Sequence, residues 1–359
     1  MSAQLGTVLP SEPSADWGLV PVTTLPRTRA LAWANNILYV SEGYTVKQGS
    51  CHSETIEWQT IARFDPPVWR RLTSRSRLPH RLVRDGFHAL VALASGHLIG
   101  TVPGAIVNRS PDSTEFLPTH AITRGTRPLH LTATPNGTIF WGEYFDNPHR
   151  NEVHIYASAD NGGSWHIAHT FPKGTIRHVH NIVYDQWENC LWILTGDYGS
   201  ECQILRASCD LAHVEVVRAG NQQARAVALV PAADGLYFSS DTPLEANHIY
   251  RLGRDGALSK LSMLTSSSIY GCRVGEHVFF STMVEPSRVN SDQHVRIYGT
   301  GDGTAWKSLL AWQKDRWSMR FFQYGNAILP DGLNSTAYFA VSSIAVQGAD
   351  LATMIFRIT

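Results

Sequence analysis

The stretch VHIYASADNGGSWHIAHTF, residues 153–171, decides the fold. It begins and ends with short segments that alternate apolar and polar residues, as half-buried strands do. Between them, the Asp160 carboxylate can accept backbone N–H bonds of a tight turn, and Gly162 can supply a positive φ. Trp165 then follows at the start of the second strand, where it can pack between neighbouring sheets. The stretch therefore predicts a β-hairpin with a tight, polar turn.

Similar turns recur along the chain at a nearly constant distance. Thr300 to Trp306 gives a good second copy, and the others are degenerate. The anchoring aspartates are Asp65, Asp112, Asp160, Asp210, Asp255 and Asp302, with spacings of 47, 48, 50, 45 and 47 residues. A fixed period of this length is the sequence signature of a repeat architecture.

A second series of turn pairs alternates with the first, each followed by a strong strand. These pairs are Asn35-Asn36, Ser95-Gly96, Asn136-Gly137, Glu188-Asn189, Asp234-Gly235, Gly275-Glu276 and Asp331-Gly332. Each repeat then contains four strands, which is the content of one propeller blade. The sequence predicts an all-β fold, a seven-bladed β-propeller with four-stranded antiparallel blades.

The segment from Ser158 to Trp165 has the pattern S-x-D-x-G-x-x-W and resembles the Asp-box of the BNR-repeat propellers. That family includes sialidases, which use an arginine triad, a Tyr–Glu pair and an Asp. The Arg-Ile-Pro signature of sialidases is absent here, and seven blades differ from their six. The resemblance therefore implies the repeat and the blade, and it does not carry over the sialidase activity.

The seventh repeat ends with residues 354–359, which fit a third strand and leave the blade without its fourth. The N-terminal segment, residues 17–24, has no other place in the repeat. We expect it to close the ring as the missing outer strand, because an open seam would expose two sheet edges. The whole chain, residues 1–359, is then one propeller domain.

Composition excludes several classes of protein. Charged residues make up 17% of the chain and hydrophobic residues 43%, so it can bury a core and is not disordered. Lys+Arg and Asp+Glu both number 30, which argues against a nucleic-acid partner. The apolar residues 87–107 are better explained by two strands than by a membrane span. The N-terminus has no signal-peptide pattern, so we expect a cytoplasmic protein, or one exported with a signal that this chain lacks.

Arginines stand at the entrance of most innermost strands. In a propeller these positions converge on the central funnel, where guanidinium groups suit carboxylate or sulfate recognition. The expected substrate-binding residues are Arg29, Arg127, His130, Arg177, Arg225 and Arg320. The alternative is that each arginine pairs with a carboxylate of a neighbouring blade.

Carboxylates and aromatic residues end the second strand of several repeats. The richest are the third and fourth, and the expected catalytic residues are Tyr144, Glu143, His178, His180, Asp197 and Tyr198. His178 and His180 share one face of a strand, and Arg177 is expected on the other. Such a histidine pair can bind a metal, but no third ligand stands at a fixed spacing. We therefore expect neither a metal nor a cofactor.

Two chemistries fit these residue types. In β-elimination on a uronate polysaccharide, an arginine neutralises the carboxylate and a histidine or tyrosine moves the proton. The chain resembles seven-bladed polysaccharide lyases of this kind in architecture and residue types. Hydrolysis by a carboxylate pair such as Glu143 and Asp197 is the first alternative. Non-catalytic binding of a glycan or protein is the second, because a fold does not fix a function. The expected partner in the leading hypothesis is an acidic oligo- or polysaccharide.

Overall fold

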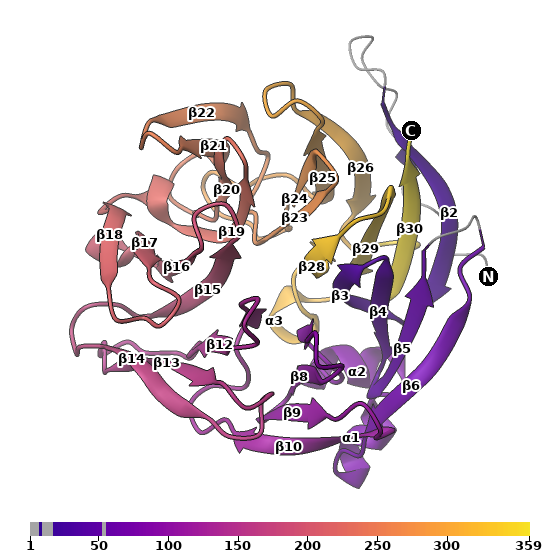
Figure 1. Ribbon diagram of the computed structural model, residues 1–359. Helices are drawn as coiled ribbons and strands as arrows, with labels where there is room; N and C mark the ends of the chain where they lie inside the picture. The colour runs from indigo at the N-terminus through magenta and orange to yellow at the C-terminus, as the bar shows by residue number, and fades with distance from the viewer. Residues whose placement is uncertain (1–6, 9–16, 52–54) are drawn as a thin grey trace. The chain divides into compact units, whose positions relative to one another are not determined.

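The computed structural model describes residues 7–8, 17–51 and 55–359. Their contacts divide the chain into two compact units. Unit 1 contains residues 1–86 and 261–359, and unit 2 contains residues 87–260. Among the described residues four sheets are four-stranded and antiparallel, each a blade of the predicted kind, and the remaining strands form one sheet of five strands and one of nine (Figure 1). The predicted fold class is confirmed, whereas the single domain stays a prediction.

Unit 2 contains the second to fifth blades in sequence order. Their strands are β7 (Leu90–Ala92), β8 (Leu98–Val102), β9 (Ala105–Arg109), β10 (Glu115–Ala121), β11 (Thr132–Ala133), β12 (Ile139–Gly142), β13 (Val153–Ser158), β14 (His166–Phe171), β15 (His178–Asp185), β16 (Cys190–Gly196), β17 (Gln203–Ala207), β18 (Val214–Ala219), β19 (Ala226–Ala232), β20 (Gly235–Ser240), β21 (His248–Gly253) and β22 (Leu258–Met263). Each blade is a meander in which every strand pairs with the next one along the chain.

Alternation along a strand explains how these blades pack. On β16, Leu191 and Ile193 join a core cluster with residues of β12 and β13, while Trp192 and Leu194 join another with β19 and β20. Successive side chains of a strand point to opposite faces of the sheet. Both faces of the fourth blade are therefore buried, which is why all seven residues of β16 are buried.

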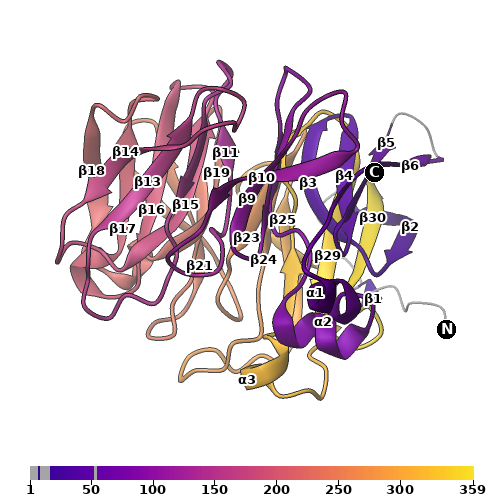
Figure 2. The same cartoon turned by 90° about the horizontal axis from the view of Figure 1, so that it is seen from below.

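Unit 1 contains the first, sixth and seventh blades and three short helices. Its elements are β1 (Thr7–Val8), β2 (Leu19–Pro26), β3 (Arg29–Asn35), β4 (Ile37–Glu42), β5 (Thr45–Ser50), β6 (Trp58–Phe64), α1 (Val68–Thr73), α2 (Arg77–Val83), β23 (Tyr270–Val274), β24 (His277–Ser281), β25 (His294–Thr300), β26 (Lys307–Gln313), α3 (Met319–Phe322), β27 (Asn326–Ile328), β28 (Asp331–Asn334), β29 (Tyr338–Ile344) and β30 (Ala352–Ile358). Helices α1 and α2 follow the first blade and lie beside one another (Figure 2).

The N-terminal strand completes the seventh blade. β2 pairs antiparallel with β30 from Leu19 opposite Ile358 to Pro26 opposite Ala352, and the order of the sheet is β2-β30-β29-β27. β2, residues 19–26, thus lies beside β30, where the sequence places residues 17–24. Closure of the ring as a whole stays a prediction.

Two predicted turns are wrong. Asp65 follows β6 at the end of the first blade and does not lie between its third and fourth strands, which end and begin at Ser50 and Trp58. Asp331-Gly332 forms no hairpin turn, because β28 pairs in parallel with β3. The Asp331-Gly332 pair fits the spacing of the other turn pairs, but it does not form the same structure.

Candidate functional site

The site lies in unit 2, where β15 begins and β16 ends. His178 pairs with Gly196 at this end of the sheet, and Asp197 follows directly after β16. The register shifts between Val179 and Asn181, so His180 occupies a β-bulge. Bulges re-aim side chains and are common beside functional sites. Here the bulge directs the second histidine towards the same carboxylate as the first.

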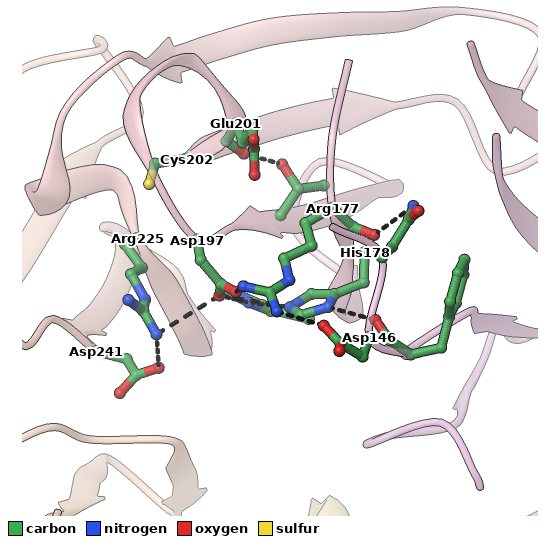
Figure 3. Close-up of polar contacts among 12 residues, drawn as sticks. Asp146, Arg177, His178, Asp197, Glu201, Cys202, Arg225 and Asp241 are labelled. Carbon is green, nitrogen blue, oxygen red and sulfur yellow. Dashed lines mark hydrogen bonds and ion pairs between the residues drawn. The ribbon is translucent and has the colours of Figure 1, made fainter. Parts of the chain in front are cut away.

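His178, His180 and Asp197 form a buried triad (Figure 3). The two Nε2 atoms are 3.1 Å apart, and the Asp197 Oδ1 atom lies 3.2 Å from Nε2 of His180 and 3.4 Å from Nε2 of His178. Each ring turns its Nδ1 atom to a backbone carbonyl, Phe145 O at 3.1 Å and Ala226 O at 2.9 Å. The carbonyls can only accept, so Nδ1 donates in both rings and Nε2 faces the triad centre.

Two arginines flank the triad, each held by carboxylates. Arg177 binds Asp197 Oδ2 at 3.2 Å and Asp146 at 2.6 Å. Arg225 places Nη2 3.5 Å from both Asp197 and Asp241. The alternative that arginines pair with carboxylates of neighbouring blades is correct for these two. The expectation that Arg177 points away from the histidines is wrong, because it starts one residue before β15 and reaches the same carboxylate.

The surroundings shift the pKa of two triad groups. Burial would raise the pKa of Asp197, but hydrogen bonds and charge interactions with His178 and His180 outweigh it and hold this pKa well below the usual range. Burial lowers the pKa of His178 below that of an exposed histidine, against the opposing effect of Asp197. Asp197 is therefore ionised at neutral pH, and His178 is neutral.

Glu143 pairs with groups other than the histidines. It is buried and forms a bidentate ion pair with Arg124, and it also accepts the backbone N–H of His154 at 2.8 Å. Asp197 has a different set of partners. The two carboxylates predicted as a hydrolytic pair are thus each held by other groups.

Two tyrosines lie at the rim of the triad. The ring of Tyr144 has its centroid 4.3 Å from that of His178. Tyr198 follows Asp197 and is 46% exposed, with its ring 5.8 Å from the guanidinium carbon of Arg225. The side chain of Arg225 is 12% exposed, and its Nε and Nη1 atoms are buried and have no hydrogen-bond partner among the described residues. An exposed aromatic face thus covers a cation with unused donors.

The other predicted binding residues stand on other elements. Arg127 and His130 precede β11 in unit 2, and Arg29 begins β3 in unit 1. Arg320 is exposed within α3 and does not begin a strand, so its predicted position is wrong. The two apolar residues that follow it, Phe321 and Phe322, resemble the start of a strand, but they belong to α3.

Two buried amides brace the site and were not predicted. Asn147 donates to the backbone O of Arg177 at 3.0 Å. Gln222 donates to the backbone O of Asp197 at 3.2 Å and accepts from Thr242 at 2.6 Å. Neither amide belongs to a recognisable motif, and only the polar character of the loops that carry them was visible in the sequence.

Comparison with solved structures gives propellers at low sequence identity. A chain of the crystal structure of the mitotic checkpoint complex has a TM-score of 0.56 at 13% identity and covers 98% of this chain and 99% of that one. The WD40 β-propeller domain of Doa1 has a TM-score of 0.55 at 12% identity, with 94% and 96% covered. The β-propeller domain of Myceliophteria thermophila Cps50 (Swd1) has 0.56 at 10%, with 92% and 100% covered. At these identities the likeness shows the fold alone.

No family model matches the sequence, and no curated protein matches it. The class that fold and neighbours define is a β-propeller, with WD40-type domains among its structural neighbours. The resemblance to BNR-repeat proteins is not shown by these likenesses. None of the helices in the described part of the chain is long and apolar enough to cross a membrane.

Proposed function

We propose that the protein is a binding propeller that recognises an acidic saccharide without turning it over. The observation that carries this proposal is Arg225, a guanidinium beneath the half-exposed ring of Tyr198 whose Nε and Nη1 atoms have no hydrogen-bond partner among the described residues. The Arg225 guanidinium offers a fixed positive charge and a single N–H donor on each of two edges to a carboxylate, and a tyrosine ring can lie against the apolar face of a sugar. A uronate residue offers both groups at once.

The carboxylates favour binding over hydrolysis. Glu143 is locked by Arg124, and Asp197 is held ionised by the histidines. A binding role is supported by the similar chain in the structure of the mitotic checkpoint complex, because that chain belongs to a complex and a propeller fold does not fix a catalytic function. We further propose that the turns at Asp160 and Asp302 are Asp-boxes of the BNR type with a structural role. Their support is the set of hydrogen bonds that Ser158 and Thr300 donate to the two aspartates.

β-Elimination is a second candidate, because one observation favours it. The Tyr144 ring lies beside His178, so a phenol and an imidazole adjoin the arginines that would neutralise a uronate carboxylate. The two groups could then share removal of the proton and protonation of the leaving oxygen. Accumulation of an unsaturated uronate would distinguish this candidate from binding.

A pair of matched variants tests the binding proposal. Tyr198 and Trp187 are both partly exposed and belong to the fourth blade. The ring centroid of Tyr198 is 5.8 Å from the guanidinium carbon of Arg225, and that of Trp187 is 5.9 Å from the guanidinium carbon of Arg254. Tyr198 follows β16, whereas Trp187 lies in the turn between β15 and β16. Loss of an aromatic contact of about 1 kcal/mol weakens binding about fivefold. We expect Tyr198→Ala to raise the Kd for oligouronates by about that factor in calorimetric titration, and Trp187→Ala to leave it unchanged.

The same samples are checked for chemistry. We expect no rise in the ultraviolet absorbance of an unsaturated uronate and no new reducing ends. A rise in that absorbance would replace the binding proposal with elimination, and reducing ends without it would indicate hydrolysis. Equal affinity for a neutral oligosaccharide, or equal weakening by both variants, would contradict recognition at Arg225 and Tyr198.

A further inference from the structure

We infer that His178, His180 and Asp197 form a binding site for one divalent transition-metal ion, with Zn²⁺ the ion that fits best. Two nitrogens and one oxygen meet with separations of 3.1, 3.2 and 3.4 Å. Ligands at about 2.0–2.1 Å from a tetrahedral zinc ion are roughly 3.3–3.4 Å apart. The three donors therefore already stand within a few tenths of an ångström of one face of such a tetrahedron.

The orientation of the imidazoles favours a cation at the centre. Both Nδ1 atoms donate to backbone carbonyls, Phe145 O and Ala226 O. Both Nε2 atoms are thereby left to face each other and Oδ1 of Asp197, so three potential metal ligands point at one centre. Metal-binding histidines characteristically use the other ring nitrogen in this way.

The charges around the triad sum to a negative value, which favours a bound cation. Arg177 and Arg225 are the cations, and Asp146, Asp197 and Asp241 are the carboxylates in contact with them. Two positive and three negative charges leave a net charge of −1. Arg177 binds Oδ2 of Asp197 at 3.2 Å and Arg225 lies 3.5 Å from Oδ1, while Oδ1 is directed at the histidines. Hydrogen bonds of this kind fix a metal-binding carboxylate.

The backbone is built to hold the second histidine in place. A Cβ atom on Gly196 would lie 2.7 Å from Cε1 of His180. That distance is too short for any real side chain, so glycine at this position leaves the space that the imidazole fills. The bulge at His180 and the small residue opposite it act together to bring Nε2 to the triad.

The set of ligands indicates the kind of site. Two histidines and one carboxylate are typical of open zinc centres, in which a water or ligand takes the fourth position, and of iron centres with open positions. A closed structural zinc site would have a fourth protein ligand. We therefore place an exchangeable ligand, and not a fourth side chain, on the remaining position.

Titration of the metal-free protein tests this inference. The chain is treated with a chelator, dialysed, and titrated with ZnCl2 by calorimetry and with CoCl2 by visible absorption, without any saccharide. We expect one ion per chain, with cobalt bands of a four- or five-coordinate site. His178→Ala and His180→Ala should each weaken binding by more than about 100-fold, beyond the 10–100-fold typical of outer-shell changes. Gly196→Ala should weaken it without removing a ligand.

His154→Ala is the matched control, because His154 also lies on a strand of unit 2 but contacts Thr170. It should bind metal like the wild type. Circular dichroism reports whether each variant folds. If the histidine variants do not fold, the imidazole ¹⁵N resonances of the wild type give the answer. Two Nε2 signals should shift on addition of Zn²⁺ while their Nδ1–H groups stay hydrogen-bonded.

Three results would overturn the inference. They are the absence of stoichiometric uptake, uptake unaffected by both histidine substitutions, and resonance shifts confined to other histidines. The first would leave a shared proton as the cation of the triad. Because no saccharide is present, failure here leaves the proposed binding function untouched, and failure to bind oligouronates leaves the metal site untouched.

Discussion

At the scale of single residues, Asp160 shows how a turn is fixed by one carboxylate. It accepts the backbone N–H of Ser164 at 2.9 Å and the hydroxyls of Ser158 and Ser164 at 2.7 Å. The Ser158 oxygen in turn accepts the N–H of Gly162. These hydrogen bonds, led by that from the Ser164 backbone, lower the pKa of Asp160 to about 2. The turn therefore depends on the ionised form.

This dependence gives a pH-resolved prediction. Asp160→Ala should lower the free energy of unfolding by about 1–2 kcal/mol at neutral pH, because several hydrogen bonds to a charged group are lost. The unfolded carboxyl has a pKa of about 3.9, so its contribution is complete above that pH and is lost as pH falls through the folded pKa of about 2. Urea unfolding of both proteins across this range measures the difference.

The control is Asp112→Ala, which removes an exposed carboxylate from the corresponding turn of the second blade. It should change stability little at any pH. A difference between wild type and Asp160→Ala that stays constant or grows on acidification would contradict the role of the ionised carboxylate.

At the scale of elements, the strand pattern was predictable because its signals are local. Period-two alternation and turn pairs such as Asn136-Gly137 act within a few residues. Asp331-Gly332 carries the same local signal, but β28 pairs with β3 from the other end of the chain. Tertiary pairing overrode the turn, and nothing within the segment reveals a distant partner.

The candidate site was predictable in part for the same reason. His178 and His180 were visible as neighbours on one strand, and Asp197 as a carboxylate after another. The turn pair Glu188-Asn189 predicts the return of the second strand, β16, beside the first, β15, but the bulge that directs His180 to Asp197 is not encoded in any local signal. The third partner of the histidine pair therefore needed the structure.

The outer strand of the seventh blade gives a prediction at this scale. Deleting residues 1–24 removes most of β2 and leaves β30 with an unpaired edge. We expect a large fall in melting temperature or loss of soluble protein, measured by differential scanning calorimetry. Deleting residues 1–16 is the control, since it spares β2 and removes only the two-residue β1 among the described elements. An unchanged melting temperature in the longer deletion would contradict a structural role for β2.

At the scale of the molecule, one buried arginine ties distant parts of unit 1 together. Arg81 of α2 is fully buried and forms ion pairs with Asp315 and Asp350, and it donates to the backbone O of Phe322 in α3. These partners are more than two hundred residues away along the chain. Removing one member of a buried network leaves the other charges without compensation.

Arg81→Met should therefore cost about 3–5 kcal/mol of unfolding free energy. Arg77→Met is the matched control, because Arg77 lies on the same helix and pairs with Asp350 but is 52% exposed. Exposed pairs contribute about 0–1 kcal/mol, so the control should stay close to the wild type. Denaturant unfolding compares the two, and equal costs would contradict the role assigned to burial.

The pairing of β2 with β30 also sets an order of events during synthesis. Every other blade is a meander of neighbouring strands and can assemble as soon as its own segment leaves the ribosome. The seventh blade joins β2 to β30, strands that lie more than three hundred residues apart, and the backbones of Gly18 and Thr359 exchange hydrogen bonds at its margin. Contacts of such long range form slowly. During synthesis β2 therefore waits for this partner until β30 has been made, after the strands of the blades between them.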